Sequence, residues 1–149
     1  MQKKQNKIWF HRNEWDSDNA KKLLEEKCLA IGFASFYEAA EEICRKRGDI
    51  YNICAKITKK KPNIYLEDFT RTMVKGDWVI VPTFPKRNQF SIYELTEDCA
   101  RPISQLRGSN SAELGFFRNV RVVVYGATST WPVKEWNRRG KRTSRKNAK

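Results

Sequence analysis

The sequence predicts an α+β fold, in which a small five-stranded β-barrel is flanked by helices. Two observations support this class. Strand-like segments alternate with apolar stripes of helical spacing in the first half of the chain, whereas the second half carries three strand-like segments. The three late strands must pair with the two early ones, and five strands of this length can wrap into a small barrel.

The N-terminal part predicts a strand, a helix and a second strand. The segment "KIWFHR" over Lys7–Arg12 alternates as a strand does. Asp16 and Ser17 are suitable N-caps for a helix over Asp18–Lys27, whose apolar residues form one stripe. The segment "CLAIGF" over Cys28–Phe33 is a continuous apolar run, which is typical of a buried central strand.

Three more helices follow. Ser35 and Glu38 have the spacing of a capping box, which predicts the start of a helix that Gly48 ends. Asp49 is the expected cap of the next helix, and Pro62 terminates it. A short fourth helix places three apolar side chains on one face: Leu66, Phe69 and Met73.

The pattern then changes to strands. Gly76 and Asp77 form a turn, because glycine tolerates a positive φ and aspartate hydrogen-bonds nearby backbone amides. The basic loop "FPKRNQ" joins the first two strands, and a loop rich in glycine and serine precedes the third. The predicted strands are Trp78–Thr83, Phe90–Thr96 and Arg118–Tyr125.

The chain of 149 residues is long enough for one domain, which we place at residues 1–130, followed by a disordered basic tail over 131–149. Lys and Arg number 30 against 17 Asp and Glu, which gives a net charge of +13, and the tail from Lys134 contributes +7 of it. This balance indicates a polyanionic partner, most often nucleic acid. The tail alone is explained equally well as a solubilising segment, as a linker stub or as a source of phosphate affinity.

Composition also excludes several classes. No apolar run approaches the ~18 residues of a membrane-spanning helix, and the N-terminus lacks the apolar core of a secretory signal. The cysteines at positions 28, 44, 54 and 99 match no zinc spacing, so we expect free thiols, no metal, no cofactor and a cytoplasmic location. The single histidine, His11, is expected to be structural or to make one polar contact.

No pattern of a catalytic site is convincing. The chain has no phosphate-binding glycine loop, no nucleophile elbow and no Cys–His pairing. Asp16 with Glu25, Glu26 and Lys27 loosely matches a nuclease motif, but the last three residues end a predicted helix rather than lie on a strand. The sequence therefore predicts a protein that is not an enzyme.

Three segments, "AKKLLEEKCLAIGF", "EDFTRTMVKGDWVIVP" and "FFRNVRVVVY", resemble PUA-like domains of the EVE kind. They are especially similar to the N-terminal domains of Mrr-type, modification-dependent restriction proteins. The resemblance spans roughly residues 7–125, and its most specific part is formed by Phe69, Met73, Gly76 and Asp77. It implies a PUA-like barrel with flanking helices, a fold that binds nucleic acid in this family, in which several members flip a modified base into an aromatic-lined pocket. The chain departs from the family at Ser91–Leu95, which lacks the family's glycines, and at Tyr125, where the family has tryptophan.

Aromatic residues are the candidates for the base pocket. Trp9 and Phe10 point to opposite faces of a strand, so one of them is expected to be buried, and Trp78 serves either as core or as a pocket wall. Trp15 lies in a polar loop, where it either packs on the body or stacks on a base. Phe33 and Phe36 bracket the loop that borders the ligand cleft in the resembling family.

Basic residues are the candidates for phosphate contacts, which position a nucleic acid without reading its sequence. The alternative is ordinary solvated charge. The candidates lie in the predicted loops and the tail: Lys86, Arg87, Arg101, Arg107, Arg138, Arg139 and Arg142.

The sequence thus predicts a nucleic-acid-binding module that inspects modified bases, with DNA favoured over RNA, in a restriction or phage-defence context. An effector domain or a partner protein of the same system would accompany it. The alternatives are a non-catalytic adaptor domain with a basic tail, and an RNA-binding protein.

Overall fold

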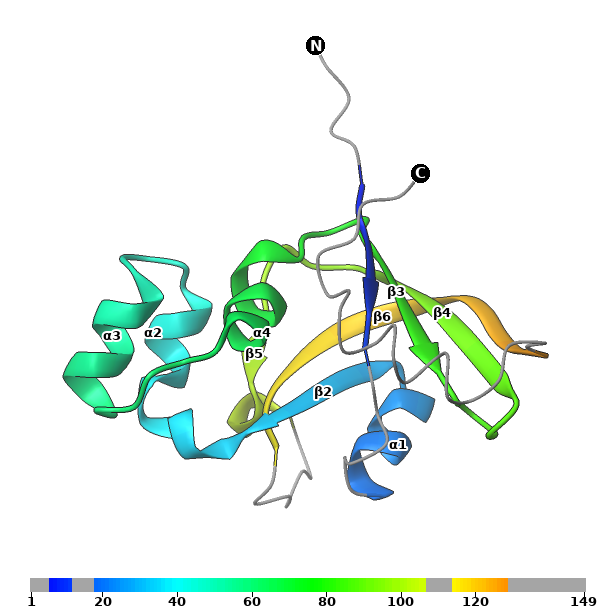
Figure 1. The fold of residues 1–149 in the computed structure, drawn as a ribbon, viewed down its shortest axis with the longest axis horizontal. Helices are drawn as coiled ribbons and strands as arrows, with labels where there is room; N and C mark the ends of the chain where they lie inside the picture. Colours follow the sequence, from blue (N-terminus) through cyan, green and yellow to red (C-terminus); the bar gives the residue numbers. More distant parts are fainter. Residues whose placement is uncertain (1–5, 12–17, 107–113, 129–149) are drawn as a thin grey trace, which may run out of the picture.

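A curled sheet of six strands forms a half-barrel (Figure 1). The helices of residues 40–67 gather at one of its ends, whereas the first helix, Asp18–Glu25, lies apart from them (Figure 1). The structure is a computed structural model that describes residues 6–11, 18–106 and 114–128. The strands are β1 (Ile8–Phe10), β2 (Cys28–Phe33), β3 (Trp78–Pro82), β4 (Gln89–Leu95), β5 (Arg101–Pro102) and β6 (Leu114–Thr128). The α-helices are α1 (Asp18–Glu25), α2 (Ala40–Cys44), α3 (Ile50–Ile57) and α4 (Ile64–Glu67). Two 3-10 turns, η1 (Ala34–Ala39) and η3 (Ile103–Gln105), and a π-helical turn, η2 (Asp68–Thr72), complete the fold.

This architecture agrees with the predicted α+β class. The strands follow the order β1-β3-β4-β6-β2, with β5 also paired to β6. The prediction of five strands missed β5, because a strand of only two residues has no periodicity to detect. It also missed the start of β6 at Leu114–Phe117, which directly follows a loop rich in glycine and serine.

The long strand β6 joins the two parts of the sheet. Its first part pairs antiparallel with β2, so that Leu29 lies opposite Arg118, and its second part pairs antiparallel with β4. β3 and β4 form the predicted hairpin, and the short β1 pairs parallel to β3. β6 therefore connects the β2 side of the curled sheet to the β3–β4 hairpin.

The helices begin largely where the sequence predicts. Asp49 caps α3 by accepting a hydrogen bond from the backbone N–H of Tyr51 (2.9 Å), which confirms the predicted cap. Asn63 caps α4 in the same way. The capping box at Ser35 and Glu38 is wrong, because the chain enters the 3-10 turn η1 directly from β2 without a side-chain cap. The predicted caps of α1, Asp16 and Ser17, lie outside the described residues.

Three helices end on a lysine in the left-handed region. Lys27, Lys46 and Lys59 follow α1, α2 and α3 with φ of 66°, 58° and 57°. Glycine is the usual residue in such positions, because a left-handed conformation costs a side chain about 1–2 kcal/mol. A positive charge at a helix C-terminus interacts favourably with the helix dipole, which offsets part of this cost.

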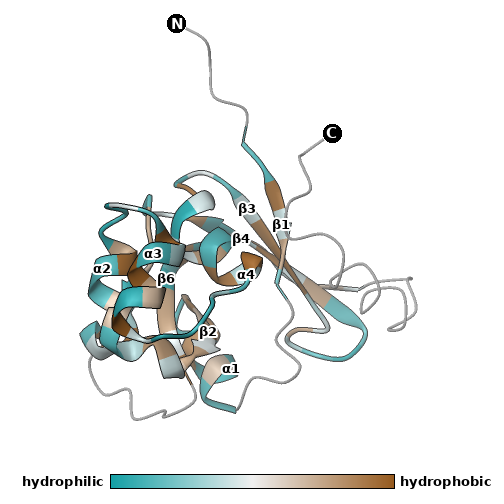
Figure 2. Cartoon of the chain, turned by 60° about the vertical axis from the view of Figure 1, so that its left-hand side comes forward, coloured by the Kyte–Doolittle hydropathy of each residue, from teal (hydrophilic) through white to brown (hydrophobic). Residues whose placement is uncertain are grey.

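The core lies between the concave side of the sheet and the helices, and hydrophobic residues colour parts of β1, β3 and the helices brown in Figure 2. The larger buried cluster draws on β1, β2, β3, β4, β6 and all four α-helices, and its largest members are Trp9, Tyr93, Phe69, Phe116, Leu24 and Leu29. Cys28, Cys44 and Cys54 are buried and all four cysteines are free, as the sequence predicts. Burial raises the pKa of the Cys44 thiol to about 12, so this thiol is a core residue rather than a nucleophile.

Asp77 fixes β1 to the body. Gly76 has φ 92°, so the turn before β3 requires its conformational freedom. The buried Asp77 carboxylate then accepts hydrogen bonds from three donors: the backbone N–H of Val74 (3.1 Å), the backbone N–H of Lys7 (3.1 Å) and the Trp9 indole Nε1–H (3.0 Å). The sequence predicts this turn only from local residues, but Asp77 in it also binds β1, which lies almost seventy positions earlier in the chain.

Arg118 fixes the α4–η2 segment to β6. Its side chain is fully buried, and its guanidinium donates to the carbonyl oxygens of Phe69 (2.8 Å), Met73 (2.8 Å) and Glu97 (2.6 Å). Burial lowers the pKa of Arg118 to about 10, while nearby acidic groups including Asp77 favour its charged form. Arg118 therefore remains a cation at neutral pH, and it donates hydrogen bonds to carbonyl oxygens within and directly after the π-helical turn.

We predict that Arg118→Met destabilises the protein strongly. The carbonyls of Phe69 and Met73 would lose their donor, and an unsatisfied buried carbonyl costs about 1–3 kcal/mol. The expected loss corresponds to a fall in Tm of roughly 10 °C in a thermal melt.

Arg121→Met is the matched control, because Arg121 on the same strand forms an exposed pair with Glu94 (2.8 Å), and such pairs contribute about 0–1 kcal/mol. Equal melting temperatures for the two variants would show that the buried guanidinium does not stabilise the fold.

Candidate nucleic-acid interface

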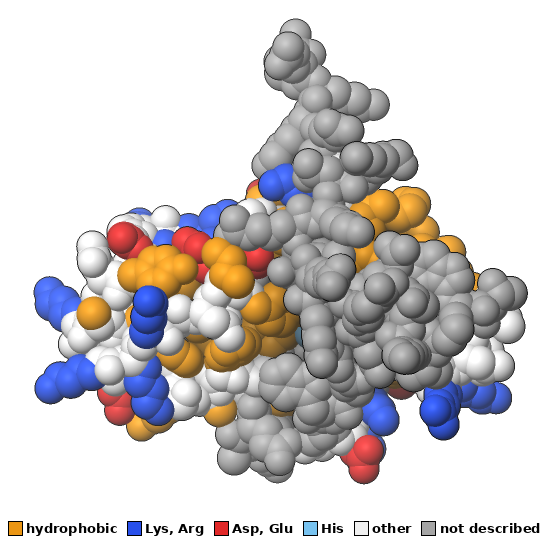
Figure 3. All heavy atoms as spheres, in the orientation of Figure 1, with side chains coloured by type: hydrophobic (Ala, Val, Ile, Leu, Met, Phe, Trp, Pro, Cys, Tyr) orange, Lys and Arg blue, Asp and Glu red, His pale blue; other side chains and the backbone are white. Residues whose placement is uncertain are grey.

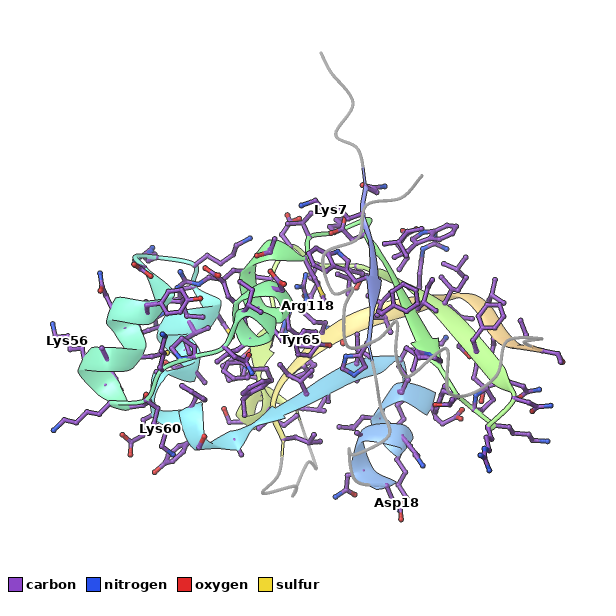
Figure 4. All side chains as sticks on the ribbon, viewed as in Figure 1. Lys7, Asp18, Lys56, Lys60, Tyr65 and Arg118 are labelled. Carbon is purple, nitrogen blue, oxygen red and sulfur yellow. The ribbon has the colours of Figure 1, made fainter. Side chains whose placement is uncertain are left out.

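Three rings from two distant parts of the chain meet beside β1. The ring centroids of His11 and Tyr65 lie 6.0 Å apart, those of His11 and Phe69 6.1 Å, and those of Tyr65 and Phe69 6.4 Å. The Nδ1 atom of His11 is hydrogen-bonded to the Tyr65 hydroxyl. His11 and Phe69 are buried, whereas Tyr65 is half-buried, and it lies near the middle of the face shown in Figure 4. We call these three residues the Tyr65 cluster.

The backbone explains why these rings converge. His11 directly follows β1, and its backbone N–H continues the β1–β3 pairing by donating to the Ile80 carbonyl (2.9 Å). Tyr65 and Phe69 are four residues apart on α4 and the π turn, so their side chains share one face. π turns are frequent at functional sites, because they re-aim side chains within a helix.

A second aromatic pair stands at the end of β2. The ring centroids of Phe33 and Phe36 lie 6.2 Å apart at an interplanar angle of 59°. Phe33 has φ 63°, an unusual conformation for a bulky residue, and it is half-buried. Gly115 on β6 makes this possible, because a Cβ there would lie 2.7 Å from the carbonyl oxygens of Gly32 and Phe33. The two phenylalanines that the sequence proposes for the pocket are thus brought together by a strained backbone, a feature that concentrates at binding sites.

The other aromatic candidates lie elsewhere. Trp9 is fully buried and bonded to Asp77, so it belongs to the core. Phe10 is half-buried on the outward side of β1, opposite Ile80. Trp78 is 37% exposed on the outward side of β3, where its Nε1–H donates to Glu94 (3.3 Å). Trp15 lies outside the described residues.

The basic candidates do not form one rim. Lys86 and Arg87 are exposed at the tip of the β3–β4 hairpin, whereas Arg101 opens β5 near α2, and Figure 1 shows these two places far apart. Arg101 is also ion-paired with Glu97. The remaining candidates lie outside the described residues: Arg107, Arg138, Arg139 and Arg142.

A cavity of about 320 Å³ lies between α2 and β5. Its lining includes Cys44, Cys99 and the cations Arg45 and Arg101, each of which is already paired with a glutamate. Within the described residues, no group of three or more His, Cys, Asp or Glu side chains could hold a metal ion. The two cations that line the cavity are therefore already paired, and the Cys44 thiol belongs to the core.

No family model, curated protein or solved structure matches this chain. In the described part, no helix is long and apolar enough to cross a membrane. Tyr65 is the functional candidate that the sequence did not predict. The spacing of Tyr65 and Phe69 after the cap Asn63 was the available signal.

The Glu94 carboxylate accepts hydrogen bonds from Trp78 and Arg121. Hydrogen bonds from Arg121, foremost, and from Trp78 hold the pKa of Glu94 below its ordinary value of 4.5. The pair thus stabilises the fold above the ordinary pKa, and this contribution is lost as the pH falls through the lowered value. We predict that Arg121→Gln raises the pKa of Glu94 in an NMR titration of the side-chain carboxyl.

Trp78→Phe removes the weaker donor and is expected to raise the same pKa less. An unchanged pKa of Glu94 in Arg121→Gln would show that Arg121 does not hold the carboxylate in solution.

Proposed function

We propose that this chain is a non-catalytic nucleic-acid-binding module that inspects bases, with DNA as the favoured partner, and that it belongs among the PUA-like domains of the EVE kind. The observation that carries the proposal is the Tyr65 cluster, in which a half-buried tyrosine ring stands on a buried Phe69 and is hydrogen-bonded to a buried His11. A modified base in a restriction or phage-defence setting is the substrate that the resemblance favours.

Energetics support an aromatic site of this kind. Extruding a base from a stack costs a few kcal/mol, and stacking on a protein ring returns about 1–3 kcal/mol per base. Phe33 offers a second half-buried ring, next to Phe36. The net charge of +13 supplies a general attraction to phosphates, which does not distinguish one base from another. Discrimination among bases requires an aromatic site such as the Tyr65 cluster.

The adaptor alternative has one observation in its favour. The outward side of the β1–β3–β4 part of the sheet carries partly exposed apolar residues, among them Trp78, Ile80 and Ile92. A patch of this kind is typical of protein contacts. In that case the basic tail alone would bind nucleic acid, and the folded body would bind a protein.

Substitution of Tyr65 tests the base-inspecting function. We predict that Tyr65→Ala weakens binding of an oligonucleotide with a modified or unpaired base about ten-fold, on the order of 1.4 kcal/mol, because a stacking surface is lost. The salt dependence of binding should not change, since no phosphate contact is removed. Fluorescence anisotropy over a salt series measures both quantities.

Tyr37→Ala is the matched control, because Tyr37 is 70% exposed on η1 and its hydroxyl donates a hydrogen bond to its neighbour Glu38 (3.2 Å). Thermal melts confirm that each variant is folded. Equal affinities for Tyr65→Ala and Tyr37→Ala would contradict a base wall at Tyr65.

Removal of the basic tail distinguishes base recognition by the folded body from phosphate binding by the tail. The chain 1–128 ends with β6 and keeps all described residues. We predict that it retains base-dependent binding but shows a shallower salt dependence, by roughly 0.9 in log–log slope for each duplex phosphate contact removed with the tail. A truncated chain that binds no nucleic acid at all would instead favour the adaptor with a basic tail.

A further inference from the structure

The stretch that runs from the last turn of α3 into its connection with α4 carries the most concentrated unpaired charge in the described part of the chain. It contains "KITKKK", in which Lys56, Lys59, Lys60 and Lys61 are all exposed and no acidic residue intervenes. The ion pairs found among residues 6–11, 18–106 and 114–128 involve Arg45, Arg101 and Arg121, and none involves these lysines. We call Lys56–Lys61 the lysine segment.

The lysine segment is held in a defined shape. The backbone N–H groups of Thr58 and Lys59 both donate to the Cys54 carbonyl, at 2.9 and 2.8 Å, and Lys60 N–H donates to the Thr58 hydroxyl (3.3 Å). Cys54 before the segment and Pro62 after it are buried. A preorganised backbone lowers the entropic cost of binding, because less chain freedom is lost on contact.

The lysine segment lies close to the Tyr65 cluster along the chain. Lys60 precedes Tyr65 by five residues, so their Cα atoms are separated by at most about 18 Å. Phosphates of one strand are about 3.4 Å apart along a duplex axis, so this span covers about five nucleotides. Figure 4 shows Lys56 and Lys60 extending outward at the α3 end of the molecule, and Figure 3 shows blue side chains along that same edge.

We propose that the lysine segment contacts the phosphates of the nucleic-acid strand whose base is held at the Tyr65 cluster, an inference that rests on the proposed function. The four ammonium groups grip the backbone within a few nucleotides of the inspected base. This surface differs from the phosphate candidates of the sequence analysis, of which Arg101 is paired with Glu97 and Lys86 and Arg87 lie at the far hairpin.

The experiment compares two variants of the full chain with equal charge. In the first, the lysine segment is neutralised by K56Q, K59Q, K60Q and K61Q. In the second, four exposed lysines elsewhere are neutralised by K21Q, K22Q, K27Q and K75Q. Each set removes four charges and includes one lysine with a left-handed backbone, Lys59 or Lys27, so strain and net charge are matched.

The probes are a labelled single-stranded DNA and its duplex, measured by anisotropy between about 50 and 200 mM salt. Each lost phosphate contact makes the slope of log affinity against log salt shallower by about 0.7 on single strands and 0.9 on duplex. A variant that has lost four contacts should therefore lose roughly 50- to 150-fold less affinity than the unaltered chain when the salt is raised over this range. We expect this change in the lysine-segment variant and a slope close to that of the unaltered chain in the control variant.

Equal slopes for the two variants would overturn the inference. If the unaltered chain distinguishes bases and Tyr65→Ala removes that distinction while the slopes are equal, the proposed function stands and the lysine segment alone is refuted. If the unaltered chain binds neither probe, both proposals fail.

Discussion

The fold depends on one buried cation. Arg118 lies on β6, the strand that joins both parts of the sheet, and its buried guanidinium donates to three backbone carbonyls. One of these carbonyls, on Phe69, lies within the π turn, and another, on Met73, directly follows it. Lysine could not replace it, since a single ammonium lacks the planar fork that addresses several acceptors at once. The position of the α4–η2 segment is therefore dictated by an arginine almost fifty residues later.

Asp77 is the complementary constraint. Its carboxylate holds Lys7 and Trp9 and thereby places β1 beside β3, which brings His11 to its site. The Tyr65 cluster thus stands where two elements meet, each fixed by one buried charge: β1 by Asp77 and α4–η2 by Arg118. Buried charges are costly unless fully compensated, and in return they specify a single arrangement. This coupling explains how a short edge strand and a short helix present their rings at a defined distance.

The sequence predicts the parts of this structure that rest on local patterns. The strand Cys28–Phe33, the cap Asp49 and the turn at Gly76 follow from apolar runs, side-chain chemistry and backbone freedom, and the structure confirms them. The capping box at Ser35 failed because Phe33 turns into the left-handed region, which Gly115 permits from eighty residues away. The hydrogen bond between His11 and Tyr65 escaped prediction for the same reason, since 54 positions separate the two residues and no local pattern encodes their meeting.

In the proposed function, the Tyr65 cluster recognises a base through its rings and its His11–Tyr65 hydrogen bond. The proton shared between His11 and the Tyr65 hydroxyl sits on either partner's side according to the histidine tautomer, so the hydroxyl acts as a donor or as an acceptor. Stacking alone treats every base alike, because every base has a π face. The Tyr65 hydroxyl, fixed at the edge of its ring, could add a hydrogen bond to the edge of a bound base. A base that buries this hydroxyl without pairing with it would lose more binding free energy than a base that pairs with it gains. In the proposed function, selectivity among bases would therefore reside in the His11–Tyr65 pair, whereas affinity would reside in the rings and the lysines.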